Sequence, residues 1–352
     1  MKIAVIGGGN GAYAAAADLT EKGHEVRLWR RNADALRASK TLTLKDADGE
    51  RAVPIAGNSP DIADAIRGAE LIFLPDPAFT QADNAKRIAP HLCDGQVVFL
   101  APGTFGSWIM AQGIRGENAA DVAFAETGTL PWLTRKHGPT TTAITARATR
   151  LPTGVYPARK REHAFSVLKR IFPVEPVEDA LSGALMNAGP VIHPPLILMN
   201  AGPLEHFERW DIHKEGTQPS IRRVTDALDA ERIAVREALG YRAPHFPLAD
   251  HYRTDGDEWM YGRRVHKKLT DSRDWHEHIV LTEHRYMRED VEHGLAFLVS
   301  VAEWAGVPCP VARGLLALGS AVVGRDLRRE GRTLDNLGLA SLSKKELRER
   351  LN

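Results

Sequence analysis

A single histidine is the side chain of this sequence best placed to exchange protons with a substrate. His193 stands among apolar residues and directly before Pro194 and Pro195. Proline lacks a backbone N–H and restricts the residue before it, so we expect a kinked helix that holds the imidazole in one direction. Histidine titrates near neutral pH and suits general acid–base catalysis. In such an apolar setting, however, a histidine is more often structural, and the position alone does not establish catalysis.

The charged segment 283–291 holds the second set of candidates, on an otherwise apolar helix. Arg285 and Glu289 are four residues apart, which is also the spacing of an ion pair on a solvated helix face. Arg285 and Asp290 are five residues apart and would point roughly 140° from each other on a straight α-helix. One of them must therefore sit at a bend if both are to face one site.

The N-terminal residues have the pattern of a dinucleotide-binding βαβ unit. Strands over 2–6 and 24–29 flank a glycine turn and an alanine-rich helix, and Gly7, Gly9 and Ala12 occupy G-x-G-x-x-A. The first glycine permits the tight turn, the second admits a pyrophosphate, and the alanine permits close helix packing. The predicted cofactor-binding residues of this turn are Gly7, Gly9, Asn10, Gly11 and Ala12.

The end of the second strand favours NADP(H) over NAD(H). NAD-specific sites usually place an acid here for the ribose hydroxyl. This chain has Arg30 and Arg31 instead, and no acid before Asp34. Arginine donates in a fork that suits a 2′-phosphate. We therefore predict NADP as the cofactor, with NAD as the alternative, and assign Arg30 and Arg31 to its binding.

The elements that must position these residues alternate between strand and helix up to residue 179. Because ligands bind at the carboxyl ends of parallel strands, Pro75, Asp76, Pro102 and residues 127–129 are expected to rim the cofactor cleft, and Pro75 is assigned to cofactor binding. The expected elements are a hairpin of 42–44 with 51–55, strands at 70–74, 96–100, 122–126, 140–148 and 154–156, and helices at 59–68 (with Ser59 as N-cap), 80–91 and 161–172.

The second half lacks this alternation and is predicted to be all helical. The segment 243–271 is its least regular part, interpreted as a loop over the cleft or a solvated connection. The expected helices are 180–192, 194–201, 220–239, 274–304, 311–322 and a last short one opened by a capping box at Ser343 and Glu346. The predicted fold is an α/β Rossmann-like doubly wound domain (1–179) followed by an all-α domain (180–352).

Composition agrees with this plan and excludes other classes. The 352 residues suggest about two domains, and 46 Lys and Arg against 45 Asp and Glu give no basis for nucleic-acid binding. Two cysteines argue against a disulfide framework, and no spacing indicates a metal site. No apolar run is long enough to span a membrane, and no signal peptide is expected, so we predict a cytoplasmic protein. The oligomeric state, including a homodimer, stays open.

Four separated motifs follow one another along the chain. They are Gly7-Gly8-Gly9-Asn10-Gly11-Ala12, Glu126-Thr127-Gly128-Thr129-Leu130-Pro131-Trp132, His193-Pro194-Pro195-Leu196 with Asn200-Ala201-Gly202, and Arg285-Tyr286 with Glu289-Asp290-Val291. With these motifs in this order, the chain resembles the octopine/nopaline, or opine, dehydrogenases over almost its whole length. Members of this family join the amino group of an amino acid to an α-keto acid and reduce the imine with NAD(P)H.

The resemblance implies a role for each matched residue. His193 would be the acid/base and Asp290 its charged partner, which stabilises the imidazolium and fixes its tautomer. Arg285 would bind the substrate carboxylate or support the pair, and Thr129 and Thr134 would lie near the substrate pocket. The alternatives on the same fold are a hydroxy-acid dehydrogenase, an imine reductase and a non-catalytic cofactor-binding protein.

This sequence departs from the family pattern at two places. Glu292 and His293 follow Val291 where the family often has a proline and an aromatic residue, and Thr134 stands where some relatives carry a cysteine. These departures leave the substrate's identity open.

Overall fold

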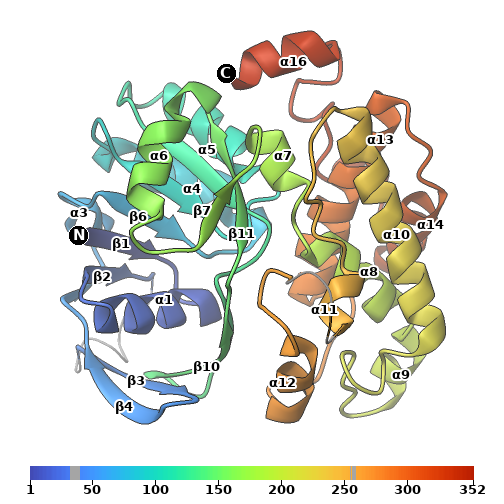
Figure 1. The fold of residues 1–352 in the computed structure, drawn as a ribbon, viewed down its shortest axis with the longest axis horizontal. Helices are drawn as coiled ribbons and strands as arrows, with labels where there is room; N and C mark the ends of the chain where they lie inside the picture. The colour runs from blue at the N-terminus through green and yellow to red at the C-terminus, as the bar shows by residue number, and fades with distance from the viewer. Residues whose placement is uncertain (32–39, 254, 256–258) are drawn as a thin grey trace. The chain divides into compact units, whose positions relative to one another are not determined.

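The computed structural model describes residues 1–31, 40–253, 255 and 259–352, and the chain divides into two compact units. Unit 1 comprises Met1–Ala184 with Asn352, and unit 2 comprises Leu185–Leu351 (Figure 1). Unit 1 is a Rossmann-like α/β fold and unit 2 is helical, so the predicted fold class is confirmed. Asp34, which entered the cofactor prediction, lies outside the described residues, as do four positions of the segment 243–271.

An eight-stranded sheet forms the centre of unit 1, in the order β12-β11-β8-β7-β6-β1-β2-β5. Its neighbours pair in parallel, except that β11 runs antiparallel to β8. The middle strands are buried along their whole length, as expected for strands covered on both faces. The strands are β1 (Lys2–Ile6), β2 (Glu25–Trp29), β5 (Gly57–Ser59), β6 (Leu71–Leu74), β7 (Val97–Leu100), β8 (Ala123–Thr127), β11 (Leu151–Tyr156) and β12 (Val174–Pro176).

Most helices of unit 1 follow the sequence expectations, although the helix at 106–115 was not expected and one N-cap differs. The helices are α1 (Asn10–Glu21), α3 (Ile62–Ile66), α4 (Gln81–Ile88), α5 (Gly106–Arg115), α6 (Arg161–Leu168) and α7 (Ala180–Ala184). The N-cap of α3 is Asp61, whose carboxylate accepts from the N–H of Ala63 at 3.0 Å, so the prediction of Ser59 is wrong. Ser59 belongs to the edge strand β5, and its hydroxyl accepts from Asp61 instead.

A second, smaller sheet packs against α1. Its strands are β4 (Gly49–Pro54), β3 (Thr41–Asp46), β10 (Thr141–Arg147) and β9 (Trp132–Lys136), in that order. The β3–β4 pair is the expected hairpin, but β10 joins it here, parallel to β3, and not in the large sheet. Helix α1 contacts β1 and β2 on one side and β3, β9 and β10 on the other, so it lies between the two sheets (Figure 1).

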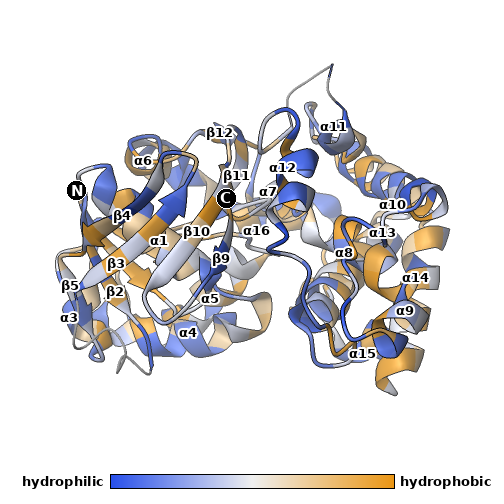
Figure 2. Cartoon of the chain, turned by 90° about the horizontal axis from the view of Figure 1, so that it is seen from below, coloured by the Kyte–Doolittle hydropathy of each residue, from blue (hydrophilic) through white to orange (hydrophobic). Residues whose placement is uncertain are grey.

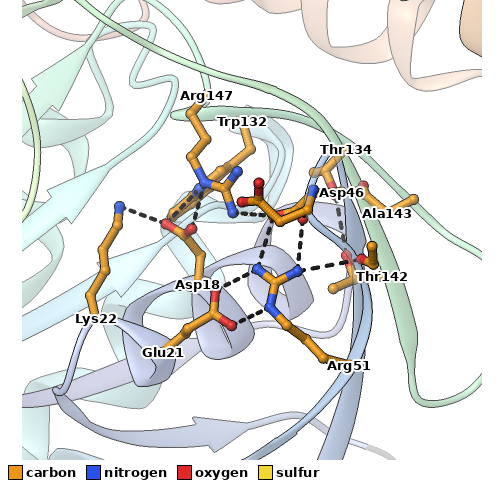
Figure 3. A network of polar contacts seen from close by, with 12 residues as sticks. Asp18, Glu21, Lys22, Asp46, Arg51, Trp132, Thr134, Thr142, Ala143 and Arg147 are labelled. Carbon is orange, nitrogen blue, oxygen red and sulfur yellow. Dashed lines mark hydrogen bonds and ion pairs between the residues drawn. The ribbon is translucent and has the colours of Figure 1, made fainter.

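A polar network fixes the small sheet to α1 (Figure 3). Asp18 of α1 accepts from Trp132 Nε1 at 3.0 Å and from Arg147 Nε at 2.7 Å. Arg147 also bonds Asp46 at 2.7 Å, and Asp46 is bonded in turn by Arg51 at 2.7 Å. Burial alone would raise the pKa of Asp18, but Lys22 and Arg147 outweigh it and hold this pKa below its usual range. Charged groups thus hold α1 against β10 and β3, and the indole of Trp132 joins β9 to the same carboxylate.

Replacing Asp18 by alanine is expected to lower the free energy of unfolding by about 2–4 kcal/mol, because it leaves the indole N–H and Arg147 without their buried acceptor. Lys22→Ala, which removes a partly exposed ion pair with the same carboxylate, is the control and should cost less than about 1 kcal/mol. The lowered pKa adds stability above about pH 4 that is lost as the pH falls. Chemical denaturation at several pH values tests this, and equal losses in both variants would contradict it.

Unit 2 is built around a hydrophobic helix that carries His193. Helix α8 packs against the π-helix η4 and against α10 and α14, and Figure 2 shows hydrophobic colour along α8 and α14. An all-round apolar helix of this kind belongs in the centre of a bundle. The elements are α8 (Gly189–Leu198), α9 (Ala201–His206), α10 (Pro219–Ala238), α11 (Ala249–Tyr252), α12 (Val265–Ser272), η4 (Tyr286–Leu295), α13 (Ala296–Ala305), α14 (Pro310–Val323), α15 (Leu327–Glu330) and α16 (Lys344–Leu351).

Three helix predictions in unit 2 are wrong in their bounds. The expected helices 180–192 and 194–201 are divided differently, because α8 begins at Gly189 and runs through both prolines. The expected helix 274–304 begins only at residue 286, and its first part is a π-helix. The segment 243–271 is no continuous loop, since it contains α11 and most of α12. The capping box that opens α16 is present, with Ser343 and Glu346 bonded to each other's N–H.

Candidate active site

The glycine turn of unit 1 has room for a ligand where the sequence predicts one. Gly7 has φ +138° and faces Asp76, whose carboxylate oxygen would lie 2.3 Å from a Cβ at this position. Gly9, the N-cap of α1, has no other atom within 4 Å of such a Cβ. Gly11 is needed because Pro75 and Leu130 approach it closely. Protein atoms therefore pack against Gly7 and Gly11, while the space beside Gly9 is open, as pyrophosphate binding requires.

Arg30 and Arg31 line a pocket beside this turn. The pocket has a volume of about 290 Å³ and is lined by Gly7, Gly8, Trp29, Arg30, Arg31, Asp76, Thr80, Asp83 and Asn84. Arg30 also donates a hydrogen bond to the hydroxyl of Tyr13. Of the residues expected to rim the cleft, Asp76 lines the pocket, whereas Pro75 packs on Gly11. Both predicted arginines therefore lie together at a cavity next to the glycine turn.

Lys136 is a charged neighbour of the turn that sequence reasoning missed. It ends β9, and its backbone N–H donates to Asn10 Oδ1 at 3.0 Å while its ammonium donates to the carbonyl of Gly8 at 3.3 Å. Asn10 therefore anchors β9 by its side chain. No motif points to Lys136, because only the pairing of the small sheet brings it to residues more than 120 positions earlier in the chain.

His193 and Asp290 form a hydrogen-bonded pair inside unit 2. His193 Nδ1 lies 2.7 Å from Asp290 Oδ2, and the side chains are 16% and 6% exposed. The imidazole stacks on the ring of Tyr286 with 3.8 Å between ring centroids and an angle of 16°. The carboxylate and the aromatic ring therefore hold the imidazole in one orientation on its helix.

Gly189 and the π-helix make this pair possible. A Cβ at Gly189 would lie 2.1 Å from Asp290 Oδ1, so only glycine leaves the carboxylate its place. Gly294 allows a similar approach by Pro190, and together the two glycines bring α8 and η4 into close contact. A π-helix makes residues five apart neighbours. This geometry, rather than a simple bend, brings Arg285 and Asp290 to one side.

The carboxylate of Asp290 is electrostatically unusual. Burial raises its pKa to about 7, against the opposing charge of Arg285. Arg285 is itself exposed and lies over the ring of Tyr286 at 5.1 Å. Glu289 is buried like Asp290 and so does not belong to a solvated face, whereas Arg285 and Arg288 are exposed. The pair with His193 can therefore hold or release a proton near neutral pH.

The two threonines lie in unit 1 and differ in their surroundings. Thr129 follows β8 and is half-buried. Thr134 is 2% exposed in β9, and its hydroxyl donates to the carbonyl of Ala143 at 2.6 Å. The hydroxyl of Thr134 thus belongs to the interior of the small sheet. Among the described residues, no cluster of histidine, cysteine or acidic side chains could hold a metal ion, and no helix is long and apolar enough to cross a membrane.

A dinucleotide-binding α/β unit joined to a helical unit with a His–Asp pair is the plan of a two-domain nicotinamide-dependent dehydrogenase. Comparison with known proteins agrees. Residues 176–323 match the family described as NAD/NADP octopine/nopaline dehydrogenase, alpha-helical domain, and residues 2–107 match the NAD-dependent glycerol-3-phosphate dehydrogenase N-terminus. The chain is 29% identical to an opine dehydrogenase of Arthrobacter sp., over 97% of this chain and 96% of the relative.

Solved structures show the same fold. An octopine dehydrogenase in complex with NADH and agmatine superposes with a TM-score of 0.69 at 19% identity, covering 97% of this chain and 98% of the other. A yersinopine dehydrogenase with NADP⁺ bound gives 0.66 at 17% identity, covering 100% and 98%. The helical part of the chain thus matches the octopine/nopaline dehydrogenase family, and the chain is an NAD(P)-dependent oxidoreductase that is similar to opine dehydrogenases over almost its whole length.

Proposed function

We propose that this protein is an NADP(H)-dependent opine dehydrogenase that joins an α-keto acid to the amino group of an amino acid and reduces the imine. The observation that carries the proposal is the pair of His193 and Asp290, whose side chains lie 2.7 Å apart and whose carboxyl has a pKa raised by burial to about 7. The Arthrobacter relative is named an opine dehydrogenase, which supports the same reaction here.

The reaction needs a group that both donates and accepts a proton. In the reductive direction, the amine nitrogen bonds to the keto carbon, and the former carbonyl oxygen must be protonated to leave as water. In the oxidative direction, the secondary amine must lose a proton before its α-carbon can give up hydride. Because Nδ1 of His193 is held by Asp290, we assign these transfers to Nε2. A carboxylate beside the ring stabilises the imidazolium and fixes the tautomer.

The residues of unit 1 fit a nicotinamide dinucleotide, which supplies or accepts the hydride when bound. Gly9 is open toward a ligand, and the helix that follows presents backbone N–H groups for the diphosphate. In unit 2, we assign Arg285 to the substrate carboxylate, because it is an exposed cation close to Asp290.

The preference for NADPH is proposed to depend on Arg30 and Arg31. Replacing both by alanine is expected to weaken NADPH binding by roughly 10- to 100-fold, because charge-assisted hydrogen bonds to a phosphate are lost. The affinity for NADH should change little. Arg67→Ala removes an exposed arginine of unit 1 outside this pocket and serves as the control. Fluorescence titration measures both affinities, and an unchanged preference in the double variant would remove the basis for the proposal.

A spectrophotometric screen tests the reaction itself. NADPH should be oxidised only when an α-keto acid and an amino donor are both present. Reduction of a keto acid without any amine would instead indicate a hydroxy-acid dehydrogenase, and turnover of a preformed cyclic imine alone would indicate an imine reductase. Tight NADP binding with no turnover over a broad panel would indicate a non-catalytic protein.

A further inference from the structure

Two positive side chains flank one tyrosine beside the glycine turn. The ammonium of Lys136 lies 3.8 Å from the centroid of the Tyr13 ring. Arg30 donates a hydrogen bond to the hydroxyl of Tyr13. Its guanidinium carbon lies 5.8 Å from the centroid of the same ring. Tyr13 is fully buried in the first turn of α1. We call Arg30 and Lys136 the cation pair.

The two charges of the cation pair act against each other. Burial and the charge of Arg30 both lower the pKa of Lys136. Two cations held close together in a half-buried position repel each other, and an anion placed between or beside them would offset that repulsion.

The surroundings indicate where that anion would lie. Lys136 donates to the carbonyl of Gly8, and Arg30 runs along Gly8, 3.4 Å from a Cβ built there. Arg30 also lines the 290 Å³ pocket that includes Gly7 and Gly8. The cation pair therefore meets at the turn that faces the dinucleotide.

The position of Lys136 is built into the fold. Its backbone is held by Asn10, the first residue of α1, and β9 is tied to the same helix by the bond from Trp132 to Asp18. Strand and helix thus place the ammonium at the glycine turn through contacts within the protein. A preorganised cation of this kind strengthens binding because less side-chain freedom is lost.

We propose that Lys136 is a phosphate-binding residue of the cofactor site, acting with Arg30 on a phosphate group of the nicotinamide dinucleotide. The proposal rests on the nicotinamide cofactor of the proposed function and not on the opine reaction. Both the 2′-phosphate and the diphosphate have the required chemistry, and comparison of NADPH with NADH distinguishes them because only NADPH carries the former.

Lys136→Met tests the proposal, because methionine keeps an apolar stem over Tyr13 and removes the charge. We expect the dissociation constant of NADPH to rise roughly tenfold or more. A rise for NADPH alone assigns Lys136 to the 2′-phosphate, and an equal rise for NADH assigns it to the diphosphate. Affinities are measured by fluorescence titration without substrates, so the result does not depend on which reaction the enzyme catalyses.

Two further variants separate charge from structure. Lys45→Met is the matched control, since Lys45 lies in β3 of the same sheet and pairs with Glu50 at 2.9 Å; it should leave both affinities unchanged. Lys136→Arg keeps the charge and should retain most of the NADPH affinity, even if Lys136→Met lowers the melting temperature. The proposal is overturned if Lys136→Met binds both cofactors like the parent, or if Lys136→Arg loses as much affinity as Lys136→Met.

Discussion

Replacing His193 by alanine is expected to lower kcat by about 10²- to 10⁴-fold in both directions of the reaction, because the proton donor and acceptor is lost. The imidazole is 16% exposed, whereas Asp290 is 6% exposed and is bonded to Nδ1 of the imidazole. Asp290 therefore cannot take over the contact that the imidazole makes with the substrate. NADPH affinity should be unchanged, since the glycine turn and the arginines belong to unit 1. Steady-state kinetics with keto acid and amine, together with cofactor titration, measure both quantities.

A second histidine of the same unit serves as the control for this variant. His206 ends the short helix α9 and is exposed, so His206→Ala removes an imidazole from unit 2 without touching the pair. It should keep parental kcat and KM. If His193→Ala turns over like His206→Ala, while both variants remain folded by circular dichroism, then the acid–base role proposed for His193 is wrong.

The sequence could predict the cofactor turn because its determinants are local. Gly7, Gly9 and Ala12 lie within six residues, and each is required by backbone geometry that the βαβ pattern already implies. The hairpin β3–β4 was predictable for the same reason, since Gly49 at its tip adopts φ +106°. Local turn chemistry is visible in sequence without knowledge of the tertiary fold.

Local sequence patterns fail to predict the bounds of the helices around His193. Apolar periodicity predicts a helix through residue 192, yet α7 ends at Ala184 and α8 begins only at Gly189, where a Cβ would meet Asp290. Likewise, Trp275 and Ile279 are buried without being helical, so their helical spacing misleads. In both places, long-range packing overrides the local pattern.

The site itself was only partly predictable. The spacing of Arg285 and Asp290 indicates that a straight α-helix cannot place both side chains on one face. It does not indicate that the chain forms a π-helix there. Lys136 carries no motif at all. Its place at Gly8 follows from sheet pairing and from the buried contacts of Asp18, which only tertiary structure reveals.

Replacing Asp290 by asparagine is expected to lower kcat by roughly 10²-fold or more and to shift its pH dependence. In the reductive direction the pair must hold a proton, and the negative carboxylate favours the imidazolium. Removing that charge lowers the pKa at which the imidazole gives up its proton. The alkaline limb of the kcat profile should therefore move by about 1–3 pH units toward lower pH. The oxidative direction, which needs the neutral base, should retain its activity to lower pH than the parent does.

Stability distinguishes this role from a structural one. Because burial raises the pKa of Asp290 to about 7, the folded state binds more protons than the unfolded state between about pH 4 and 7, and the carboxylate's contribution to stability falls as the pH rises through that window. A neutral amide avoids this cost, so Asp290→Asn should melt no lower than the parent at pH 8. Gly189→Ala, which displaces the carboxylate without removing it, should lose both activity and stability. An Asp290→Asn variant that melts early while keeping the parental pH profile would assign the residue to structure alone.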